Sequence, residues 1–337
     1  MELKRRNWSE RNHRELKQLL AGVRPGEVAV FDWDNTCAFN DIGEALLRRL
    51  AFGLEFRMDR AAWEASLPDR IGCTGAVLLN GRPMPLRRVK GEILSAWERL
   101  RQRQGRLDND YRAFTSGLLA LNRALEQTPG IGCAFAYPWV NFLLQGFSPA
   151  ELDAISRQVV DREARAPLRR RAVLDPGRRW RHDWLDGVRL FAEMRDLAAC
   201  WQERGGRVVV SSASNRRLVQ AAAERLGFPC QEIIGMDLEV RGGRFAAKLR
   251  QGLLPNLGAG KTANLRRLGI EPALVAGDSG NDYEMLTAFA ATRLRLVVGR
   301  GGRGALRSLV RRARAGEPGF LAQEIDRRRG AFRANGC

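Results

Sequence analysis

Two aspartates, Asp32 and Asp34, stand two residues apart directly after the apolar run at 28–31. Such a run predicts a buried strand, and alternation along the strand would point both carboxylates to the same side. Two carboxylates this close repel each other, so a protein usually holds them with a cation or gives them separate chemical roles. The pair therefore indicates an enzyme; the alternative is that Asp34-Asn35-Thr36 only caps a helix.

Polar side chains also follow two later apolar runs. Ser-Ser-Ala-Ser (211–214) follows one of them, and Gly-Asp-Ser-Gly-Asn-Asp (277–282) follows the other. Lys261 lies between these segments, at the expected start of a helix. Ligands of open α/β sheets bind outside the carboxyl ends of the strands. We therefore expect the three strand ends and Lys261 to meet at one site.

With these residues the chain resembles the haloacid dehalogenase superfamily, whose four motifs occur in this order. Asp-Trp-Asp-Asn-Thr (32–36) is similar to the first motif, and Val-Ser-Ser-Ala-Ser (210–214) to the second. Gly-Lys-Thr (260–262) is similar to the lysine motif, and Gly-Asp-Ser-Gly-Asn-Asp (277–282) to the acidic fourth. Each motif alone is a weak to moderate signal, but all four in order, on the expected elements, make a specific combination.

The resemblance covers about 26–40 and 186–300 and is closest to the phosphoserine phosphatase-like branch, which includes phosphorylcholine phosphatases. A Glu-Met pair (193–194) precedes the second motif, and a Gly-Gly hairpin (242–243) follows it, as in that branch. The segment between the first two motifs is longer than the small cap of phosphoserine phosphatases. The substrate residues of those enzymes are therefore not carried over to this chain.

The resemblance implies an α/β fold: a Rossmann-like, mainly parallel sheet flanked by helices, with a large, mostly helical cap inserted after the first strand. Strands that alternate with helices after about residue 188 favour a parallel sheet independently. The expected division of the chain is an N-terminal helix packing on the core (1–25), a catalytic core (26–40 and 186–310), the cap (41–185) and a basic C-terminal tail (311–337).

Local signals predict individual helices. One is expected at 9–22, where Ser9 can cap the start and Gly22 the end, and others at 41–52 and 90–104. Another is expected from Ser148, where Ser-Pro-Ala-Glu forms a capping box. Proline and arginine at 166–181 indicate a domain boundary or a linker. The tail after 310 is expected to be helical or partly disordered.

The resemblance implies a phosphatase that works through a covalent intermediate. Asp32 would attack the phosphoryl group and form an aspartyl phosphate, which splits one difficult displacement into two. Asp34 would protonate the leaving alkoxide and later take a proton from the attacking water. Mg²⁺ prefers oxygen ligands, and Asp32, the backbone carbonyl of Asp34 and Asp278 would supply them. The expected substrate is a small phosphorylated metabolite.

Further residues of the motifs are expected to support this chemistry. Lys261 would neutralise the phosphoryl oxygens, and the hydroxyl of Ser212 would hold them together with backbone N–H groups. Ser211 is the alternative to Ser212, because a shift by one residue is possible. Asp282 would orient Lys261 or the metal ligands, and Thr36 is a supporting residue at the end of the first motif.

Residues that recognise the leaving group are expected in or near the cap. Asp41 follows the first motif, near the place where related phosphatases have an acid for the amine of the substrate. An amine or a quaternary ammonium group would be bound by an acid together with aromatic faces, for which Phe39, Tyr137 and Trp139 are candidates. The alternative for these aromatic residues is ordinary packing in the core of the cap, and packing is also the expectation for His182 and Trp184.

Composition limits the remaining possibilities. The 337 residues have 45% hydrophobic content, and no apolar run approaches the roughly 20 residues of a membrane span. The N-terminus has no apolar signal-peptide segment, so we expect a cytoplasmic protein. Six scattered cysteines and two histidines make a zinc site improbable. The oligomeric state is not indicated.

Three other functions are compatible with parts of the sequence. A phosphotransferase would use the same aspartyl phosphate with an alcohol in place of water. The net charge of +19 could serve a nucleic-acid-binding protein, but the arginines are spread along the chain and favour a generally basic surface. A nucleotide-binding P-loop at 258–262 would need a glycine where Pro255 stands.

Overall fold

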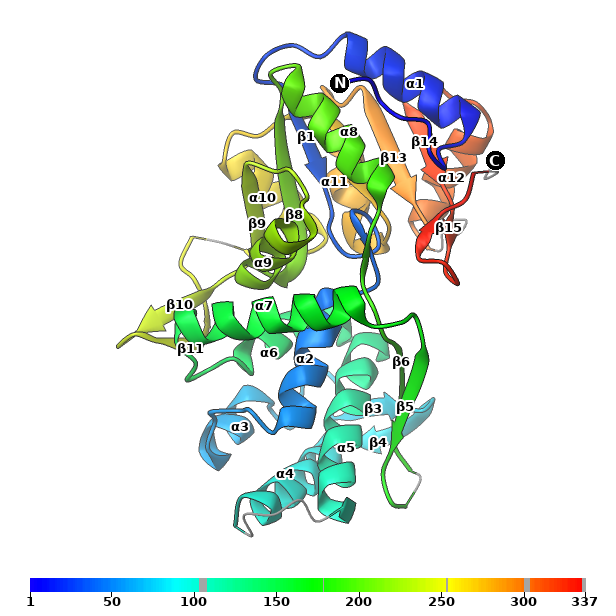
Figure 1. Ribbon diagram of the computed structural model, residues 1–337. Coiled ribbons are helices and arrows are strands. Elements are labelled where there is room, and N and C mark those ends of the chain that lie inside the picture. The colour runs from blue at the N-terminus through cyan, green and yellow to red at the C-terminus, as the bar shows by residue number, and fades with distance from the viewer. Residues whose placement is uncertain (103–107, 178, 253, 300–303, 335–337) are drawn as a thin grey trace.

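A six-stranded, wholly parallel sheet forms the centre of the protein, as the computed structural model shows over residues 1–102, 108–177, 179–252, 254–299 and 304–334 (Figure 1). The strands lie in the order β14-β13-β12-β1-β8-β9. Their bounds are β1 (Val28–Phe31), β8 (Arg207–Asn215), β9 (Glu232–Met236), β12 (Pro272–Gly277), β13 (Leu294–Val298) and β14 (Phe320–Gln323). The expected Rossmann-like α/β fold is therefore confirmed.

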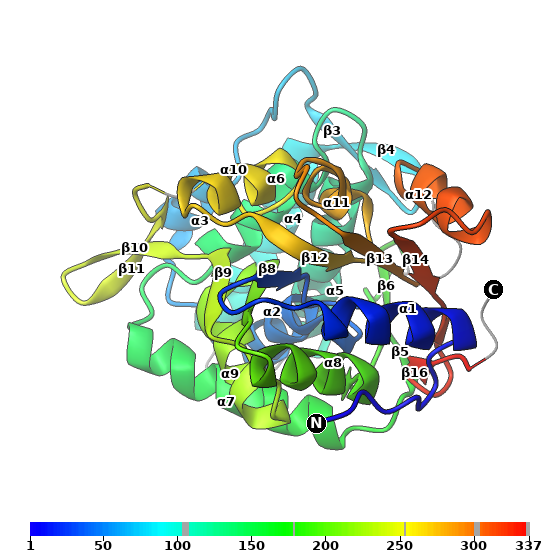
Figure 2. The same ribbon diagram turned by 90° about the horizontal axis from the view of Figure 1, so that it is seen from above.

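Helices cover both faces of this sheet (Figure 2). All four residues of β1 are buried, because alternate side chains enter the apolar cores on opposite faces. Ala29 and Phe31 belong to the core with α1 (Glu10–Ala21), α8 (Ala192–Glu203) and α9 (Arg216–Leu226). Val28 and Val30 belong to the core with α10 (Ala259–Arg267), α11 (Tyr283–Thr287) and α12 (Leu306–Arg314).

The segment between β1 and β8 forms a second, mostly helical layer that lies beneath the sheet in Figure 1. We call it the cap. It contains α2 (Ile42–Gly53), α3 (Arg60–Ser66), α4 (Leu86–Gln102), α5 (Asp108–Gln127), α6 (Gly132–Phe142) and α7 (Pro149–Arg165). It also contains two antiparallel hairpins, β3 (Ala76–Leu79) with β4 (Arg82–Pro85) and β5 (Arg170–Leu174) with β6 (Arg181–Leu185).

Two chain segments connect the cap to the core, and they are tied to each other. The short strands β2 (Ala38–Phe39) and β7 (Arg189–Leu190) pair antiparallel. Beside them, the side-chain amide nitrogen of Asn40 donates hydrogen bonds to the backbone carbonyl oxygens of Leu185 and Gly187, at 2.6 and 3.0 Å. The entry and exit of the cap therefore meet next to the end of β1.

A further hairpin extends from the core toward the cap. It joins β10 (Leu238–Arg241) and β11 (Arg244–Leu249), which pair antiparallel around the predicted glycine turn. The backbone of Phe245 exchanges hydrogen bonds with Gly146 and Phe147 of the cap, at 2.9 and 2.8 Å. The hairpin therefore contacts the cap at a second place.

Several predicted helices are confirmed. Ser9 caps α1 by accepting a hydrogen bond from the backbone nitrogen of Asn12, and Gly22 follows its last residue. Ser148 and Glu151 form the predicted capping box at the start of α7. The helix predicted at 90–104 is α4, which begins earlier, at Leu86; positions 103 and 104 lie outside the described residues.

The prediction for 166–181 was wrong. Much of this segment belongs to the β5–β6 hairpin, in which Arg170 pairs with Leu185 and Leu174 with Arg181. The first three residues of β5, including two arginines, are exposed, so the strand lacks the alternating apolar pattern that predicts a half-buried strand.

The prediction of a separate basic tail after 310 was also wrong. Residues Phe320–Gln323 form β14, which pairs with β13 in the central sheet. The chain then forms the small hairpin of β15 (Ile325–Asp326) and β16 (Ala331–Phe332), and the ring of Phe332 lies 5.1 Å from that of Trp8. This strand was not predicted because its short apolar run lies in an arginine-rich part of the sequence. Positions 335–337 lie outside the described residues.

Within the described residues, every helix is too short or too polar to cross a membrane.

Candidate active site

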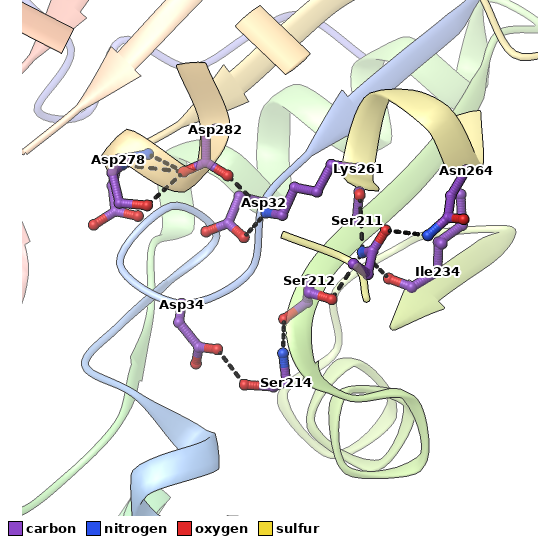
Figure 3. A network of polar contacts seen from close by, with 12 residues as sticks. Asp32, Asp34, Ser211, Ser212, Ser214, Ile234, Lys261, Asn264, Asp278 and Asp282 are labelled. Atoms are coloured by element: carbon purple, nitrogen blue, oxygen red, sulfur yellow. Dashed lines mark hydrogen bonds and ion pairs between the residues drawn. The ribbon is translucent and has the colours of Figure 1, made fainter. Parts of the chain in front are cut away.

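A buried ion cluster lies at the carboxyl end of β1 (Figure 3). Lys261, at the start of α10, is 1% exposed, and its ammonium nitrogen donates to Oδ1 of Asp32 and to Oδ1 of Asp282, both at 2.6 Å. Burial and the carboxylate of Asp282 raise the pKa of Asp32 to about 7, against the opposing effect of Lys261. Burial disfavours the ammonium form, but Asp282 and Asp32 raise the pKa of Lys261 above its ordinary value. Lys261 therefore stays charged between two acids.

Asp278 and Asp282 both follow β12, but their surroundings differ. Asp282 ends the 3-10 turn η1 (Gly280–Asp282), and its Oδ2 accepts hydrogen bonds from the backbone nitrogens of Asp278 and Ser279, at 3.1 and 3.0 Å. Among the described residues, none donates a hydrogen bond to the carboxylate of Asp278. Burial and the carboxylates of Asp32 and Asp282 raise its pKa well above the usual range. Asp278 therefore lacks the cation that Asp32 and Asp282 share.

Carboxylate oxygens of Asp32, Asp278 and Asp282 lie within 4.8 Å of one another. This is a set of oxygen ligands of the kind that Mg²⁺ accepts. The two oxygens of Asp282 already bind Lys261 and backbone N–H groups, whereas Asp278 has no such partner. The residues fit the predicted metal site at Asp32 and Asp278, and they place Asp282 where it orients Lys261.

Asp34 connects the core with the cap. Its Oδ1 accepts a hydrogen bond from the backbone nitrogen of Ile42, the first residue of α2, at 2.8 Å, and its Oδ2 accepts one from the hydroxyl of Ser214 at 2.7 Å. Burial and the carboxylates of Asp41 and Asp32 raise its pKa well above the usual range. Asp34 is thus held in place by one donor from the cap and one from the core, and these two hydrogen bonds oppose the rise of its pKa.

The two adjacent serines of the second motif have different partners. The side-chain amide of Asn256 donates to Oγ of Ser211 at 3.1 Å and to the carbonyl oxygen of Ser212 at 2.8 Å. The hydroxyl oxygen of Ser212 instead accepts a hydrogen bond from the backbone nitrogen of Ser214, at 3.1 Å. In Figure 3, Ser212 lies between Lys261 and Ser214. Both serines are fully buried, but only the hydroxyl of Ser212 is linked to Ser214, which binds Asp34.

The four motifs meet at one cavity of about 140 Å³, which also extends into the cap. Asp32, Asp34, Lys261 and Asp278 line its core end. Ser212 and Asp282 lie behind this lining, and Thr36 is fully buried with no partner for its hydroxyl among the described residues. The structure therefore brings the predicted catalytic and metal residues together.

The predicted substrate residues divide into two groups. Asp41 and Tyr137 line the cavity. Phe39 is 1% exposed and lies on β2 in the core, and Trp139 is 1% exposed with its indole nitrogen 3.4 Å from Oγ of Ser66. Neither Phe39 nor Trp139 lines the cavity, so packing accounts for both. His182 and Trp184 also pack, with their rings stacked 5.9 Å apart on β6.

The sequence is similar to one family of enzymes. A sequence model of the haloacid dehalogenase-like hydrolases matches residues 113–287, which is just over half of the chain. This range includes the second, third and fourth motifs, whereas Asp32 and Asp34 lie before it. The chain belongs to this family. No curated protein matches the chain.

Solved structures share the fold of this haloacid dehalogenase-like hydrolase. A functionally unknown protein from Anaerococcus prevotii DSM 20548 is 23% identical, with a TM-score of 0.85 over 99% of this chain and 97% of that one. A protein of unknown function from Bordetella pertussis Tohama I is 18% identical, with a TM-score of 0.51 over 90% of this chain and 99% of that one. The first of these shows that core and cap occur together in another protein.

A phosphoserine phosphatase complex is also similar, at 13% identity and a TM-score of 0.39 over 85% of this chain and 90% of that one. This score is too low to support an argument about the substrate.

Several residues of this hydrolase were not predicted to belong to the site. Ser214 binds Asp34, and Asn256 fixes the backbone of the second motif. Ser214 was visible in the sequence as the last residue of that motif, but Asn256 had no spacing signal. Three polar residues of the cap, Glu44, Asn122 and Glu126, also line the cavity. They lie on α2 and α5, and only the tertiary packing of these helices shows that they line the same cavity as Asp34.

Proposed function

We propose that this hydrolase is a Mg²⁺-dependent phosphomonoesterase that acts on a small phosphorylated metabolite through an aspartyl-phosphate intermediate. The observation that carries the proposal is the arrangement of Asp32. It is bound to the buried Lys261, lies close to Asp278, and shares a cavity with Asp34.

In the first step, a carboxylate oxygen of Asp32 attacks phosphorus, and the bond between phosphorus and the leaving oxygen breaks. Asp34 gives its proton to that oxygen, for which its raised pKa is suited. Ser214 and the backbone of Ile42 hold the Asp34 carboxyl in position. The product alcohol leaves, and the phosphoryl group remains on Asp32.

In the second step, Asp34 takes a proton from water, and the water oxygen attacks phosphorus. The acyl phosphate bond breaks, which releases inorganic phosphate and restores the Asp32 carboxylate. Lys261 neutralises negative charge that develops on the phosphoryl oxygens in both steps, with Asp282 holding it in place. Ser212 would hold a phosphoryl oxygen through its hydroxyl.

Asp32, Asp278 and the backbone carbonyl of Asp34 would hold the Mg²⁺ ion. When bound, the ion would neutralise the phosphoryl charge and the acids that Lys261 leaves uncompensated.

The test is phosphate release from an aryl phosphate and from a panel of phosphorylated metabolites, with and without Mg²⁺. We expect Mg²⁺-dependent release that falls by about a thousandfold or more in Asp32→Asn. The matched control is Asp183→Asn, which changes an exposed aspartate of the β5–β6 hairpin. Undiminished activity of Asp32→Asn would overturn the mechanism. Added acceptor alcohols, with analysis of the products, separate hydrolysis from phosphoryl transfer.

A further inference from the structure

The cap end of the active-site cavity is rich in acids. Asp41, which caps the start of α2, Glu44 of α2 and Glu126 of α5 line it. Burial, together with the carboxylates of Glu44 and Asp41, raises the pKa of Glu126 to about 8. Asp34 accepts a hydrogen bond from Ile42, the first residue of α2, so the cap acids of α2 lie on the Asp34 side of the cavity.

An unpaired acceptor lies among these acids. The side-chain amide of Asn122 donates a hydrogen bond to Oε1 of Glu126 at 3.0 Å. This fixes the amide so that its oxygen, Oδ1, is buried and has no partner among the described residues. Asn122 is 5% exposed and lines the cavity. A buried acceptor without a donor is unfavourable, so this position calls for a ligand that carries N–H or O–H groups.

Positive charge is scarce in the same lining. Among the described residues that line the cavity, the only cation is Lys261, which Asp32 and Asp282 already bind. Arg48 and Arg123 lie outside the lining, each with a guanidinium nitrogen 3.6 Å from Glu44. The cavity therefore offers no free cation for a carboxylate on the leaving group.

The rest of the lining contains apolar and neutral polar side chains but little aromatic surface. Leucine and valine side chains of α2, α6 and α9 supply much of its apolar part, and Tyr137 is its single aromatic side chain among the described residues. A quaternary ammonium group is usually bound by several aromatic faces and cannot donate a hydrogen bond to Asn122. A primary ammonium group satisfies both the acids and the unpaired amide oxygen.

We propose that Asn122 and Glu126, with Asp41 and Glu44, form a subsite that selects phosphomonoesters of primary amino alcohols without a carboxylate. This inference rests on the proposed phosphomonoesterase function and adds the class of its substrate. The ammonium group would donate to Asn122 Oδ1 and to the carboxylate of Glu126, which it would keep ionised. The short carbon chain would contact the leucine side chains of α2.

The experiment compares kcat/KM for four phosphomonoesters: phosphoethanolamine, phosphocholine, phosphoserine and the neutral ethyl phosphate. We expect phosphoethanolamine to exceed each of the others by about tenfold or more, as for a hydrogen-bonded charged group. In Glu126→Gln, the ratio of kcat/KM for phosphoethanolamine to kcat/KM for ethyl phosphate should fall toward one. Asp110→Asn, the same type of change near the other end of α5, is the control and should leave the ratio unchanged.

A second measurement does not depend on turnover of the amine substrate. Free ethanolamine should inhibit hydrolysis of an aryl phosphate more strongly than free ethanol does, and Asn122→Leu should remove the difference. Equal kcat/KM for phosphoethanolamine and ethyl phosphate, or a preference for phosphoserine or phosphocholine, would overturn the inference while the phosphomonoesterase function stands. If no phosphomonoester is hydrolysed at all, the proposed function itself fails.

Discussion

Acids of the core and acids of the cap line the same cavity, but their hydrogen-bond partners differ. In the core, Asp32 and Asp282 share the ammonium group of Lys261, and Asp282 also accepts backbone hydrogen bonds. In the cap, Glu126 has the neutral amide of Asn122 as its hydrogen-bond partner, and its pKa is raised to about 8.

This difference separates two tasks. Charges that are fixed by a buried cation and by backbone N–H groups are positioned before the substrate arrives, as a reaction centre requires. An acid that has no cation of its own gains most from a ligand that brings one. In the proposed function, the core therefore carries out the reaction and the cap selects the molecule that undergoes it.

The strongest test of the core is Lys261→Met. Removing the ammonium group leaves Asp32 and Asp282 buried without their shared cation, which should lower the free energy of unfolding by about 3–5 kcal/mol. Phosphatase kcat should fall by about 10²- to 10³-fold, because a fixed donor to the phosphoryl group is lost. Denaturant unfolding and steady-state kinetics measure the two effects.

The control for this change is Lys248→Met, which alters a lysine on the exposed β10–β11 hairpin. Its stability and kcat should stay near those of the parent protein. A Lys261→Met protein with unchanged kcat would show that the buried cluster is structural alone.

The pH dependence of the free energy of unfolding tests Glu126 of the cap, an acid that binds no cation among the described residues. The carboxyl group of Glu126 has an ordinary pKa of 4.5 and a folded-state pKa of about 8, so the unfolded chain releases this proton at lower pH than the folded protein. The free energy of unfolding should therefore decrease as pH rises, by about 3 kcal/mol between pH 5 and 7.5 from this group.

Glu126→Gln lacks this titration, so its stability relative to the parent should increase over the same pH range, as measured by denaturant unfolding at each pH. Asp110→Asn should keep the decrease of the parent. If the free energy of unfolding changed equally with pH in the parent and in Glu126→Gln, the pKa of Glu126 would not be raised, and the contrast with the core acids would fail.

Asp278 and Asp282 belong to one motif but are expected to have separate roles in the core. Asp278→Asn should raise the Mg²⁺ concentration for half-maximal activity by at least about tenfold, which corresponds to about 1.4 kcal/mol, because a ligand with no other partner is lost. Asp282→Asn should lower kcat with little change in that concentration, since Asp282 holds Lys261. Titration of activity with Mg²⁺ distinguishes them. The same shift in both variants would contradict separate roles.

The smallest effect concerns the attachment of cap to core. Arg217 of α9 binds both carboxylate oxygens of Asp153 of α7, at 3.0 and 2.9 Å. The side chains are 27% and 35% exposed, so a double-mutant cycle to alanine should give a coupling of only about 0.5–1 kcal/mol in unfolding. A much larger coupling would mean that cap and core are not distinct units at this contact.

Much of the core could be predicted because its signals are local. Apolar runs that end in Asp32, in Ser212 or in Asp278 predict parallel strands with polar ends, and Lys261 stands at a helix start. The strand Phe320–Gln323 was missed because four residues among arginines carry little periodic signal, and pairing with β13 decides their conformation. Burial of Phe39 and Trp139 likewise depends on neighbours that are distant in sequence.

The amino-acid sequence by itself indicated the family, the alternation of strands and helices through most of the core, and the residues proposed for the reaction, because each motif lies within a few residues of the strand or helix that positions it. Only the tertiary structure decided that Asp282 holds Lys261, that Asp34 is fixed by Ser214 and Ile42, and that Asn122 and Glu126 line the same cavity as Asp32 and Asp34. The hydrogen bond between Asp34 and Ser214 joins residues 180 positions apart, which only folding brings together.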